Sequence, residues 1–420
     1  MKYPKMHRIR QVIEAPEVEN LEETISQELE SLLLESKIKP GARIAVTAGS
    51  RGINHIDRIL KRIIDFLKQH EAKPFLVPAM GSHGDGSAEG QLDVLKSLNI
   101  TEETMGVPIH SSMEVVEIGK SSFDFPVLVD KLAAESDGIV VVNRIKPHTE
   151  FEGPIESGLM KMMAIGLGKH KGCVEVHKQA GNYGYLKVIP EIGQIILDKL
   201  PILFGVGIVE NIYDETAKIK AVSPDRFFEE EAELLIEAKR LMAKIPFDHL
   251  DVLIIDEIGK NISGTGLDTN VIGRIMVYGE KEPELPQINR IVVLDMTEES
   301  HGNAVGIGLS DYISDRLYTK INRSAVAKNA IAANTPEKGR IPISLPTDRE
   351  TVEAALNTIG AIKSEDARIV HIKNTLELKE MHISNALLPE TTAKTNLVIM
   401  EEIGPISFDN LENIERVVVN

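Results

Sequence analysis

The sequence predicts an α/β fold: two α/β domains with parallel-sheet, Rossmann-like character. Short apolar runs alternate with amphipathic stretches of helical spacing along most of the chain, a pattern typical of strands and helices wound into a parallel sheet. The chain has 420 residues, which is long for one ordinary hydrophobic core. We therefore expect two domains, each with its own core, and an active site in the cleft between them, where ligands commonly bind.

The first half of the chain contains the more regular series of expected elements. Residues 56–68 predict the most amphipathic helix, because their apolar residues recur at helical spacing on one side. Those residues are Ile56, Leu60, Ile63, Ile64 and Leu67. The expected strands are 43–47, 73–79, 138–142 and 203–209, and the expected helices are 22–36, 56–68, 87–98, 188–199 and 227–244.

Pro246-Phe247-Asp248 indicates a domain boundary, because a new series of elements begins after it. The expected strands of this second series are 252–255, 291–294 and 369–372, and helices are expected at 311–321 and 351–359. The predicted domains are therefore residues 1–246, which would carry the cofactor and the acid/base histidines, and residues 247–420, which would close the cleft.

Composition narrows the classes of function. The formal net charge is −17, which argues against non-specific nucleic-acid binding, since that needs a basic surface. No apolar run is long enough to cross a membrane, and the first 14 residues lack the apolar core of a signal peptide. The single cysteine, Cys173, can form no disulfide within the chain. We expect a cytoplasmic protein that binds a small molecule.

Ionisable residues and glycines are concentrated between residues 144 and 177, directly after the strand expected at 138–142. Open α/β sheets place their ligands beyond the carboxyl ends of strands, so this stretch is the first candidate for a functional site. His148, Lys161, His170 and His177 lie in it. A solvated basic segment around a helix start is the alternative interpretation.

Two loops follow the first two expected strands. Gly49-Ser50-Arg51-Gly52 combines backbone N–H groups at a helix start with a guanidinium, which suits a phosphate or carboxylate, although an ordinary tight turn is equally compatible. His83 lies among glycines after the second strand. Together with His148, it predicts a pair of imidazoles that act as acid on one side of a substrate and base on the other.

Lys161 is flanked by methionines, so it is either a nucleophile with a lowered pKa or a surface lysine on an amphipathic helix. His170 and His177 are seven residues apart, which places both on one face of a helix, and one of them is a candidate metal ligand. In the second domain, the loops 256–264 and 300–303 each follow an expected strand. Both are candidates to face the first domain, with ordinary turns as the alternative.

In this order the motifs resemble the nickel-pincer nucleotide-dependent lactate racemase family. Arg51 in Ala48-Gly49-Ser50-Arg51 matches the arginine of that family's Asp-x-Thr-Arg turn. His83 and His148 match its two catalytic histidines, and Lys161 matches the lysine that can tether the cofactor. The family's nickel-ligating histidine lies sixteen residues beyond that lysine, which corresponds to His177 here.

The resemblance implies a 2-hydroxyacid racemase or epimerase with a nickel-pincer nucleotide, a pyridinium-3,5-bisthiocarboxylic acid mononucleotide that binds Ni. His177 would complete a square-planar nickel site. A histidine would take the proton of the substrate's 2-hydroxyl while the C2 hydride moves to the cofactor and returns on either face. The implied catalytic residues are His83, His148 and Lys260, and the implied cofactor-binding residues are Ser50, Arg51, Lys161, Asn261, His301 and Gly302.

The implied partners are a small 2-hydroxy acid and the enzymes that synthesise the cofactor. Between the second histidine and the lysine, this chain departs from the family's short glycine-rich run and carries Glu150, Glu152 and Glu156. Carboxylates accept hydrogen bonds from hydroxyls, so we expect an acid larger and more polar than lactate, such as the sugar acid gluconate, unless the glutamates face solvent. Two other functions stay open: non-catalytic binding of a sugar acid or nucleotide, and a divalent-metal hydrolase or lyase that uses the same histidines.

Overall fold

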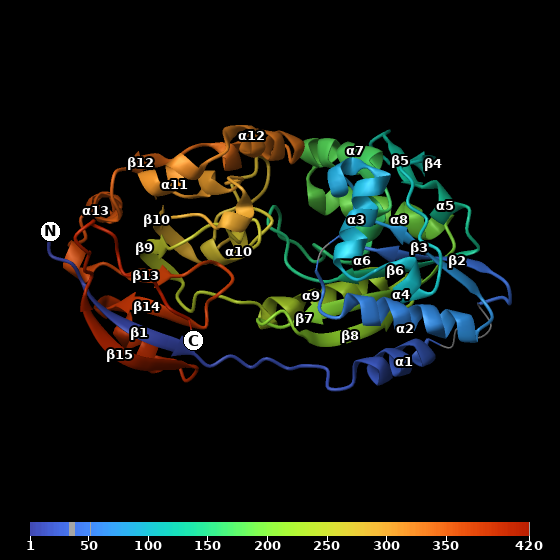
Figure 1. Ribbon diagram of the computed structural model, residues 1–420, viewed down its shortest axis with the longest axis horizontal. Helices are drawn as coiled ribbons and strands as arrows, with labels where there is room; N and C mark the ends of the chain where they lie inside the picture. The colour runs from blue at the N-terminus through green and yellow to red at the C-terminus, as the bar shows by residue number, and fades with distance from the viewer. Residues whose placement is uncertain (33–37, 51, 420) are drawn as a thin grey trace. The chain divides into compact units, whose positions relative to one another are not determined.

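The computed structural model describes residues 1–32, 38–50 and 52–419 (Figure 1). The chain forms two compact units. The first, here called the N-terminal unit, comprises residues 15–148 and 152–242. The second, the C-terminal unit, comprises residues 1–14, 149–151 and the chain from residue 243 onward. Each is an α/β structure with one large sheet, as the sequence predicted.

The N-terminal unit is built on a five-stranded sheet of order β3-β2-β6-β7-β8, in which only β8 is antiparallel to its neighbour. Its strands are β2 (Arg43–Ala48), β3 (Lys73–Pro78), β6 (Gly138–Arg144), β7 (Ile202–Glu210) and β8 (Thr216–Val222), with a separate hairpin of β4 (Val115–Lys120) and β5 (Pro126–Asp130). Its helices are α1 (Leu21–Ser31), α2 (Ile56–Gln69), α3 (Ala88–Ser97), α4 (Glu102–Met105), α5 (Lys131–Ala134), α6 (Leu159–Lys161), α7 (Lys169–Tyr183), α8 (Tyr185–Lys199) and α9 (Phe227–Leu241).

The two faces of this sheet are covered by different helices. On β7, the side chains of Phe204, Val206 and Ile208 pack in a core that α1 and α2 cover. The apolar side of α2 that the sequence predicted faces this core. The alternate positions, Gly205 and Gly207, face the other way, as the two-residue period of a strand requires. A Cβ at Gly205 would lie 2.7 Å from Leu159 of α6, so the missing side chain lets α6 and α9 pack closely on this second face.

The C-terminal unit is built on an eight-stranded sheet of order β12-β11-β10-β9-β13-β14-β1-β15. The strands are β1 (Lys5–Gln11), β9 (His249–Ile255), β10 (Gln287–Val293), β11 (Tyr312–Ser314), β12 (Ile343–Leu345), β13 (Ile369–Ile372), β14 (Glu380–Ser384) and β15 (Leu397–Pro405). The helices are α10 (Thr269–Ile272), α11 (Asp315–Lys320), α12 (Arg323–Ala332), α13 (Asp348–Asn357) and α14 (Leu388–Ala393). The five strands from β12 to β13 are parallel, and the other three pair antiparallel.

The first strand of the chain lies in the second sheet. β1 pairs with both β14 and β15, although the sequence assigned residues 1–246 to one domain. That Pro246 separates two independent domains stays a prediction. The N-terminal strand, however, belongs to the C-terminal unit. Residues 149–151 also belong to that unit, whereas the chain on either side of them belongs to the N-terminal unit.

One local prediction in this unit is wrong. Residues 311–321 were expected to be a helix, but Tyr312–Ser314 form β11, which pairs parallel with β10 and β12, and α11 begins only at Asp315. Burial in the sheet overrides the helical spacing here. The helix expected at 22–36 extends from Leu21 to Ser31, and the end of the prediction lies outside the described residues. Among the described helices, none has both the length and the apolar character needed to cross a bilayer.

Candidate active site

The loops that follow β2 and β3 meet at Ser50 and His83. The Ser50 hydroxyl and Nδ1 of His83 form a short hydrogen bond. Gln91, which is buried on α3, donates from Nε2 to the carbonyl oxygens of Gly81 (3.2 Å) and His83 (3.4 Å) and so fixes the second loop. Two residues that the sequence predicted for one site are therefore in contact. Arg51, the anion-binding residue predicted from the sequence, lies outside the described residues.

His177 lies on α7 in a small polar cluster. Its Nδ1 is 2.7 Å from the phenol oxygen of Tyr185, the first residue of α8. The thiol of Cys173, one helical turn before His177, is 3.7 Å from the hydroxyl of Ser82, which directly precedes His83. Burial alone raises the pKa of the Cys173 thiol, but His177 and Ser82 favour the thiolate and bring that pKa below its usual value. The cluster thus links the His83 loop to α7.

Gly81 explains how this close approach is possible. Its φ is +59°, a left-handed conformation that favours glycine, and a Cβ there would lie 3.1 Å from Sγ of Cys173. The glycine of the Gly81-Ser82-His83 loop therefore has two reasons to be a glycine: its backbone conformation and its contact with α7.

His148 reaches the same cluster from the segment that follows β6. Its ring centroid is 6.1 Å from that of Tyr185, and the ring of His177 is 5.8 Å from Tyr185 on a perpendicular plane. His148 lies just beyond β6, as the sequence predicted. Its backbone N–H donates to Oε2 of Glu156 at 2.6 Å. Tyr185 therefore contacts two of the predicted site histidines.

The three glutamates between His148 and Lys161 all have protein partners. Glu156, which is 1% exposed, accepts hydrogen bonds from the backbone of His148 and Gly153 and pairs with Lys239 at 2.7 Å. Burial raises its pKa, although Lys239 and these N–H groups oppose the shift. Glu152 also pairs with Lys239, at 3.2 Å. Glu150 is buried in the C-terminal unit beside Nζ of Lys338, at 3.4 Å.

These contacts remove the argument that the glutamates bind substrate hydroxyls. The oxygens of Glu156 are engaged by the protein itself, and Glu150 has a buried lysine as its counter-ion. The alternative that all three face solvent is also wrong, since only Glu152 is largely exposed.

Lys161 is the last residue of the one-turn helix α6, and a π-helical turn, Met162–Gly166, follows it. Its methionine neighbours Met160, Met162 and Met163 are buried, whereas Lys161 is partly exposed. Such π-helical turns occur frequently at functional sites. The side chain of Met162 also approaches Gly49, at 3.2 Å from a Cβ built there, so the α6 turn and the Ser50 loop are neighbours.

Glu231 of α9 holds the start of α6. It is 1% exposed, and its Oε2 accepts a hydrogen bond from the backbone N–H of Met160 at 2.8 Å. Burial raises the pKa of Glu231 to about 7, while the N–H groups of Met160 and Leu159 favour the ionised carboxylate. Because the first N–H groups of a helix lack partners within it, this carboxylate acts as a cap from another helix.

The other basic residues of the stretch 144–177 separate into structural and exposed ones. Lys169 is fully buried, pairs with Asp130 at 2.9 Å and donates to the carbonyl oxygen of Pro78 at 2.5 Å. Burial lowers its pKa, and Asp130 opposes that shift. His170 is exposed at the start of α7, where its ring lies against Gly86.

The site residues predicted in the second domain lie on two adjoining loops of the C-terminal unit. The backbone N–H of Lys260 donates to Oγ of Ser300 at 2.9 Å, and Nζ of Lys260 donates to the carbonyl oxygen of Gly264. Asn261 accepts a hydrogen bond from Thr297 at 2.8 Å. His301 and Gly302 directly follow Ser300 in the sequence, and both have a positive φ. The four predicted residues Lys260, Asn261, His301 and Gly302 therefore form one group within this unit.

Sequence reasoning missed Tyr185, Ser82 and Glu231 as contributors. Tyr185 gave no local signal, because its partners come from α7 and from the end of β6. Glu231 lies in the acidic run Glu229-Glu230-Glu231, which looks solvated. However, it is four residues after Phe227 and four before Leu235, both buried, so helical spacing does place it on the apolar face.

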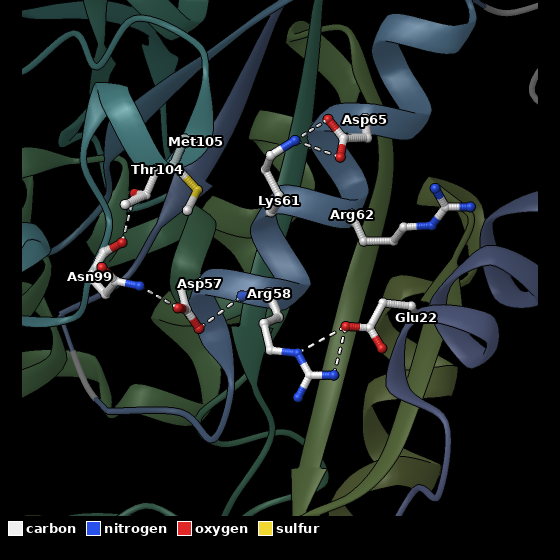
Figure 2. Close-up of a pocket in the computed structure, with 9 residues that line it drawn as sticks. All are labelled: Glu22, Asp57, Arg58, Lys61, Arg62, Asp65, Asn99, Thr104 and Met105. Carbon is white, nitrogen blue, oxygen red and sulfur yellow. Dashed lines mark hydrogen bonds and ion pairs between the residues drawn. The ribbon is translucent and has the colours of Figure 1, made fainter.

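Figure 2 shows a charged pocket that is separate from these residues. It lies on α1, α2 and α4, and its side chains pair with one another: Arg58 with Glu22 at 2.7 Å, Nζ of Lys61 with Asp65 at 2.6 Å. None of the predicted site residues lines it. Since α1 and α2 cover the sheet face opposite α6 and α9, this pocket takes no part in the candidate active site.

The described residues contain no group of three or more histidine, cysteine, aspartate or glutamate side chains arranged to hold a metal ion. A metal that brings most of its ligands on an organic cofactor needs only one protein ligand, and His177 is the predicted one.

Comparison with known proteins gives two findings. Residues 4–184 match the family model of the lactate racemase N-terminal domain. Among solved structures, the fold is similar to that of the lactate racemase apoprotein from Thermoanaerobacterium thermosaccharolyticum, with a TM-score of 0.52 and 14% identity over 87% of this chain and 94% of that one. At that identity the likeness concerns the fold. No curated protein matches the sequence. The resemblance found in the motifs is thereby confirmed for residues 4–184, which are similar to the lactate racemase N-terminal domain.

Proposed function

We propose that the protein is a racemase or epimerase that inverts C2 of a 2-hydroxy acid. The observation that carries the proposal is the gathering of three predicted site histidines in the N-terminal unit. His148 and His177 both contact Tyr185, and Cys173 connects α7 to the loop of His83. The lactate racemase N-terminal domain covers all of these residues except Tyr185, which directly follows its end.

His83 and His148 are proposed as the acid/base pair. Inversion needs a group on either side of C2 that takes the proton of the 2-hydroxyl and gives it back, and imidazole has the right pKa for both tasks near neutral pH. The Ser50 hydroxyl contacts Nδ1 of His83 and so orients its ring. The backbone N–H of His148 is fixed by Glu156, so this histidine also starts from a defined position.

The residues present fit a nickel-pincer nucleotide, the cofactor of the resembled family. The support for this fit comes from the possible metal ligand. Nδ1 of His177 is within hydrogen-bond distance of the Tyr185 phenol oxygen, and an imidazole held in this way presents Nε2 to a metal in a fixed orientation. Lys161 lies between buried methionines and would contact the cofactor at its carboxylate-derived arm. When bound, the cofactor supplies the acceptor and donor of the C2 hydride.

The remaining predicted residues have supporting roles in the proposal. Arg51 and Lys260 would bind the substrate carboxylate or the nucleotide phosphate, since both cations suit such anions. Ser50, Asn261, His301 and Gly302 would line the cofactor. The acid itself stays open between lactate-sized and polyhydroxy substrates, because Glu150 and Glu156 are engaged by the protein and no longer favour a sugar acid.

The test uses the full chain loaded with nickel-pincer nucleotide. Both enantiomers of lactate, and gluconate as a C2-epimerisable sugar acid, are incubated in D2O and separated by chiral chromatography. Inversion without deuterium at C2 is the expected result, because a transferred hydride does not exchange with solvent. Inversion with full deuterium incorporation would contradict hydride transfer, and tight binding without inversion would favour the binding-protein alternative.

The nickel ligand is tested by a matched pair of variants on α7. His177→Ala should lose nickel, measured by metal analysis, while the circular dichroism spectrum is unchanged. His170→Ala, on the same helix but exposed, is the control and should keep the metal. Full nickel in His177→Ala together with loss in His170→Ala would move the ligand to His170. Turnover with Zn²⁺ or Mg²⁺ and no pincer nucleotide would instead support the hydrolase or lyase alternative.

A further inference from the structure

Two buried carboxylates of the N-terminal unit are used to hold backbone. Glu156 and Glu231 are each 1% exposed, and each accepts hydrogen bonds from main-chain N–H groups. A buried carboxylate is costly unless it is paired or hydrogen-bonded, so its position has to be matched closely by the donors around it. The donors in both cases belong to segments that carry predicted site residues.

Glu231 contacts the segment of Lys161. The contact with the start of α6 is so close that Gly158 has no room for a side chain: a Cβ there would lie 2.3 Å from Oε1 of Glu231. The φ of Gly158 is −170°, an extended value that any residue adopts, so the glycine is required by Glu231 and not by the backbone. Gly158 and Glu231 therefore form a matched pair that sets where α6 begins.

Lys239 contacts the segment of His148 through Glu156. Nζ of Lys239 is 2.7 Å from Oε1 of Glu156, and Oε2 of Glu156 accepts the N–H of His148. The same segment is closed at its neck, because the backbones of Lys146 and Ser157 exchange two hydrogen bonds of 2.9 and 3.2 Å. Glu156 thus lies at the closed end of this loop, with its charge balanced by Lys239.

Glu231 and Lys239 are on the same helix. They are eight residues apart on α9, a spacing that brings both toward one side. The helix is fixed on β7 and Ile145 by Leu234, Leu235, Ala238 and Leu241, and Gly207 lets Leu234 approach the strand. A well-packed helix is a rigid support for side chains that must hold a site in position.

We propose that α9 is the positioning helix of the candidate active site, with Glu231 holding the turn of Lys161 and Lys239, through Glu156, holding the peptide of His148. Neither residue is assigned a chemical step. What they position rests on the proposed function, but the positioning itself is a property of the protein without cofactor. It is therefore measurable independently of catalysis.

The experiment is hydrogen exchange by mass spectrometry on the full chain without cofactor. The probes are peptides covering 146–153 and 158–163, with a β7 peptide as reference. Glu231→Gln should raise exchange in 158–163 several-fold, because the charge-assisted hydrogen bond from the N–H of Met160 becomes a weaker neutral one. Lys239→Met should do the same in 146–153. Each variant should leave the other segment and β7 within about twofold of the wild type, because α9 itself stays packed.

Two control variants sharpen the result. Glu233→Gln changes an exposed glutamate of the same helix and should alter neither segment. Lys239→Arg keeps the ion pair with Glu156 and should restore protection of 146–153. No change in either segment for Glu231→Gln and Lys239→Met overturns the proposal, and so does an equal rise in all peptides including β7, which would mean general loosening of the unit.

The loaded enzyme separates this proposal from the function itself. If the protein inverts 2-hydroxy acids, Lys239→Met and Glu231→Gln should lower kcat more than they raise KM, since they displace reacting groups without touching the substrate. If the wild type inverts no acid but exchange responds as described, the positioning role stands and the proposed function fails. If the wild type is active and exchange does not respond, the positioning role fails alone.

Discussion

The predicted site residues are held differently in the two units. In the N-terminal unit they are held by other side chains from several elements: Ser50 contacts His83, Tyr185 contacts His177, and Glu156 holds His148. In the C-terminal unit, Lys260 and Asn261 are held by their own and the adjoining loop, at Gly264 and Thr297. We expect groups that are held by several elements to keep fixed distances from one another, as acid/base chemistry requires, and the Lys260 ammonium to suit the binding of an anion.

The largest effect expected from this comparison is the loss of the acid/base histidines. His83→Ala or His148→Ala should lower kcat by roughly two to four orders of magnitude, the usual contribution of a positioned acid or base. Rates of inversion are measured in both directions for the loaded enzyme. Near-normal rates for both single variants would place the chemistry outside the N-terminal cluster.

Glu231 should make the fold less stable as the pH rises. Its pKa is about 7 in the folded protein and near 4.5 when unfolded, so the folded state binds the extra proton between these values. The free energy of unfolding that this proton contributes is fully present below pH 4.5. It is lost as the pH rises through 7, and the total loss is roughly 3 kcal/mol. Urea unfolding of Glu231→Gln should lack this loss between pH 5 and 8. An identical pH dependence in the variant would rule out a buried, titrating Glu231.

His382 of the C-terminal unit should respond in the opposite sense. Burial, and then the charge of His371, lower its pKa from 6.5 to about 4. The folded state therefore binds fewer protons than the unfolded state between pH 4 and 6.5. The contribution of neutral His382 to the free energy of unfolding is fully present above pH 6.5. It is lost as the pH falls through 4, by up to about 3 kcal/mol. His382→Gln should flatten this acid limb in urea unfolding between pH 6.5 and 4, and an unchanged limb would contradict the assignment.

Lys260 should have a smaller effect than the histidines. Lys260→Met removes one charge-assisted hydrogen bond to an anion, which corresponds to about 1.5–3 kcal/mol, or a ten- to hundredfold loss in kcat/KM that appears mainly in KM. Steady-state kinetics with the preferred acid separate the two constants. A fall in kcat as large as that of His83→Ala would mean that the C-terminal unit takes part in proton transfer, and the distinction between the units would fail.

The smallest effect is expected at the pocket of Figure 2. Arg58 and Glu22 are about half exposed, and exposed ion pairs contribute ~0.2–1 kcal/mol. Arg58→Ala should therefore change the urea midpoint slightly and leave inversion rates unchanged. A loss of turnover in this variant would assign the pocket a role that its contacts do not suggest.

The parts of the fold that the sequence predicted are those with strong local patterns. α2 and α9 were found from helical spacing, and β2, β6 and β7 from short apolar runs next to glycine-containing turns. β1, β14 and β15 were missed, because their pairing joins distant segments and leaves no local signal. β11 was mistaken for a helix because a three-residue strand carries too little pattern to compete with the helix after it.

The candidate site divides in the same way. His83, His148, Lys161 and His177 were selected from motif order and spacing, which survive in one dimension. The residues that hold them in place were not selected. Tyr185 contacts a histidine that is distant in the sequence, and Glu231 binds a backbone N–H group, which a side-chain motif does not reveal. Glu156 was noticed but given a substrate role, since the sequence does not reveal that Lys239 and the peptide of His148 occupy it.

The pairing of β1 with β14 and β15 has a consequence for synthesis on the ribosome. The first strand of the chain, Lys5–Gln11, fits between strands made only when residues 380–405 emerge. At about 5–20 residues per second, that is a delay of roughly 20–80 s during which an incomplete strand stays unpaired. The N-terminal unit has all of its residues by Met242 and is free to fold meanwhile. We therefore expect the sheet of the C-terminal unit to be completed only after β14 and β15 have been made, when β1 can pair with both.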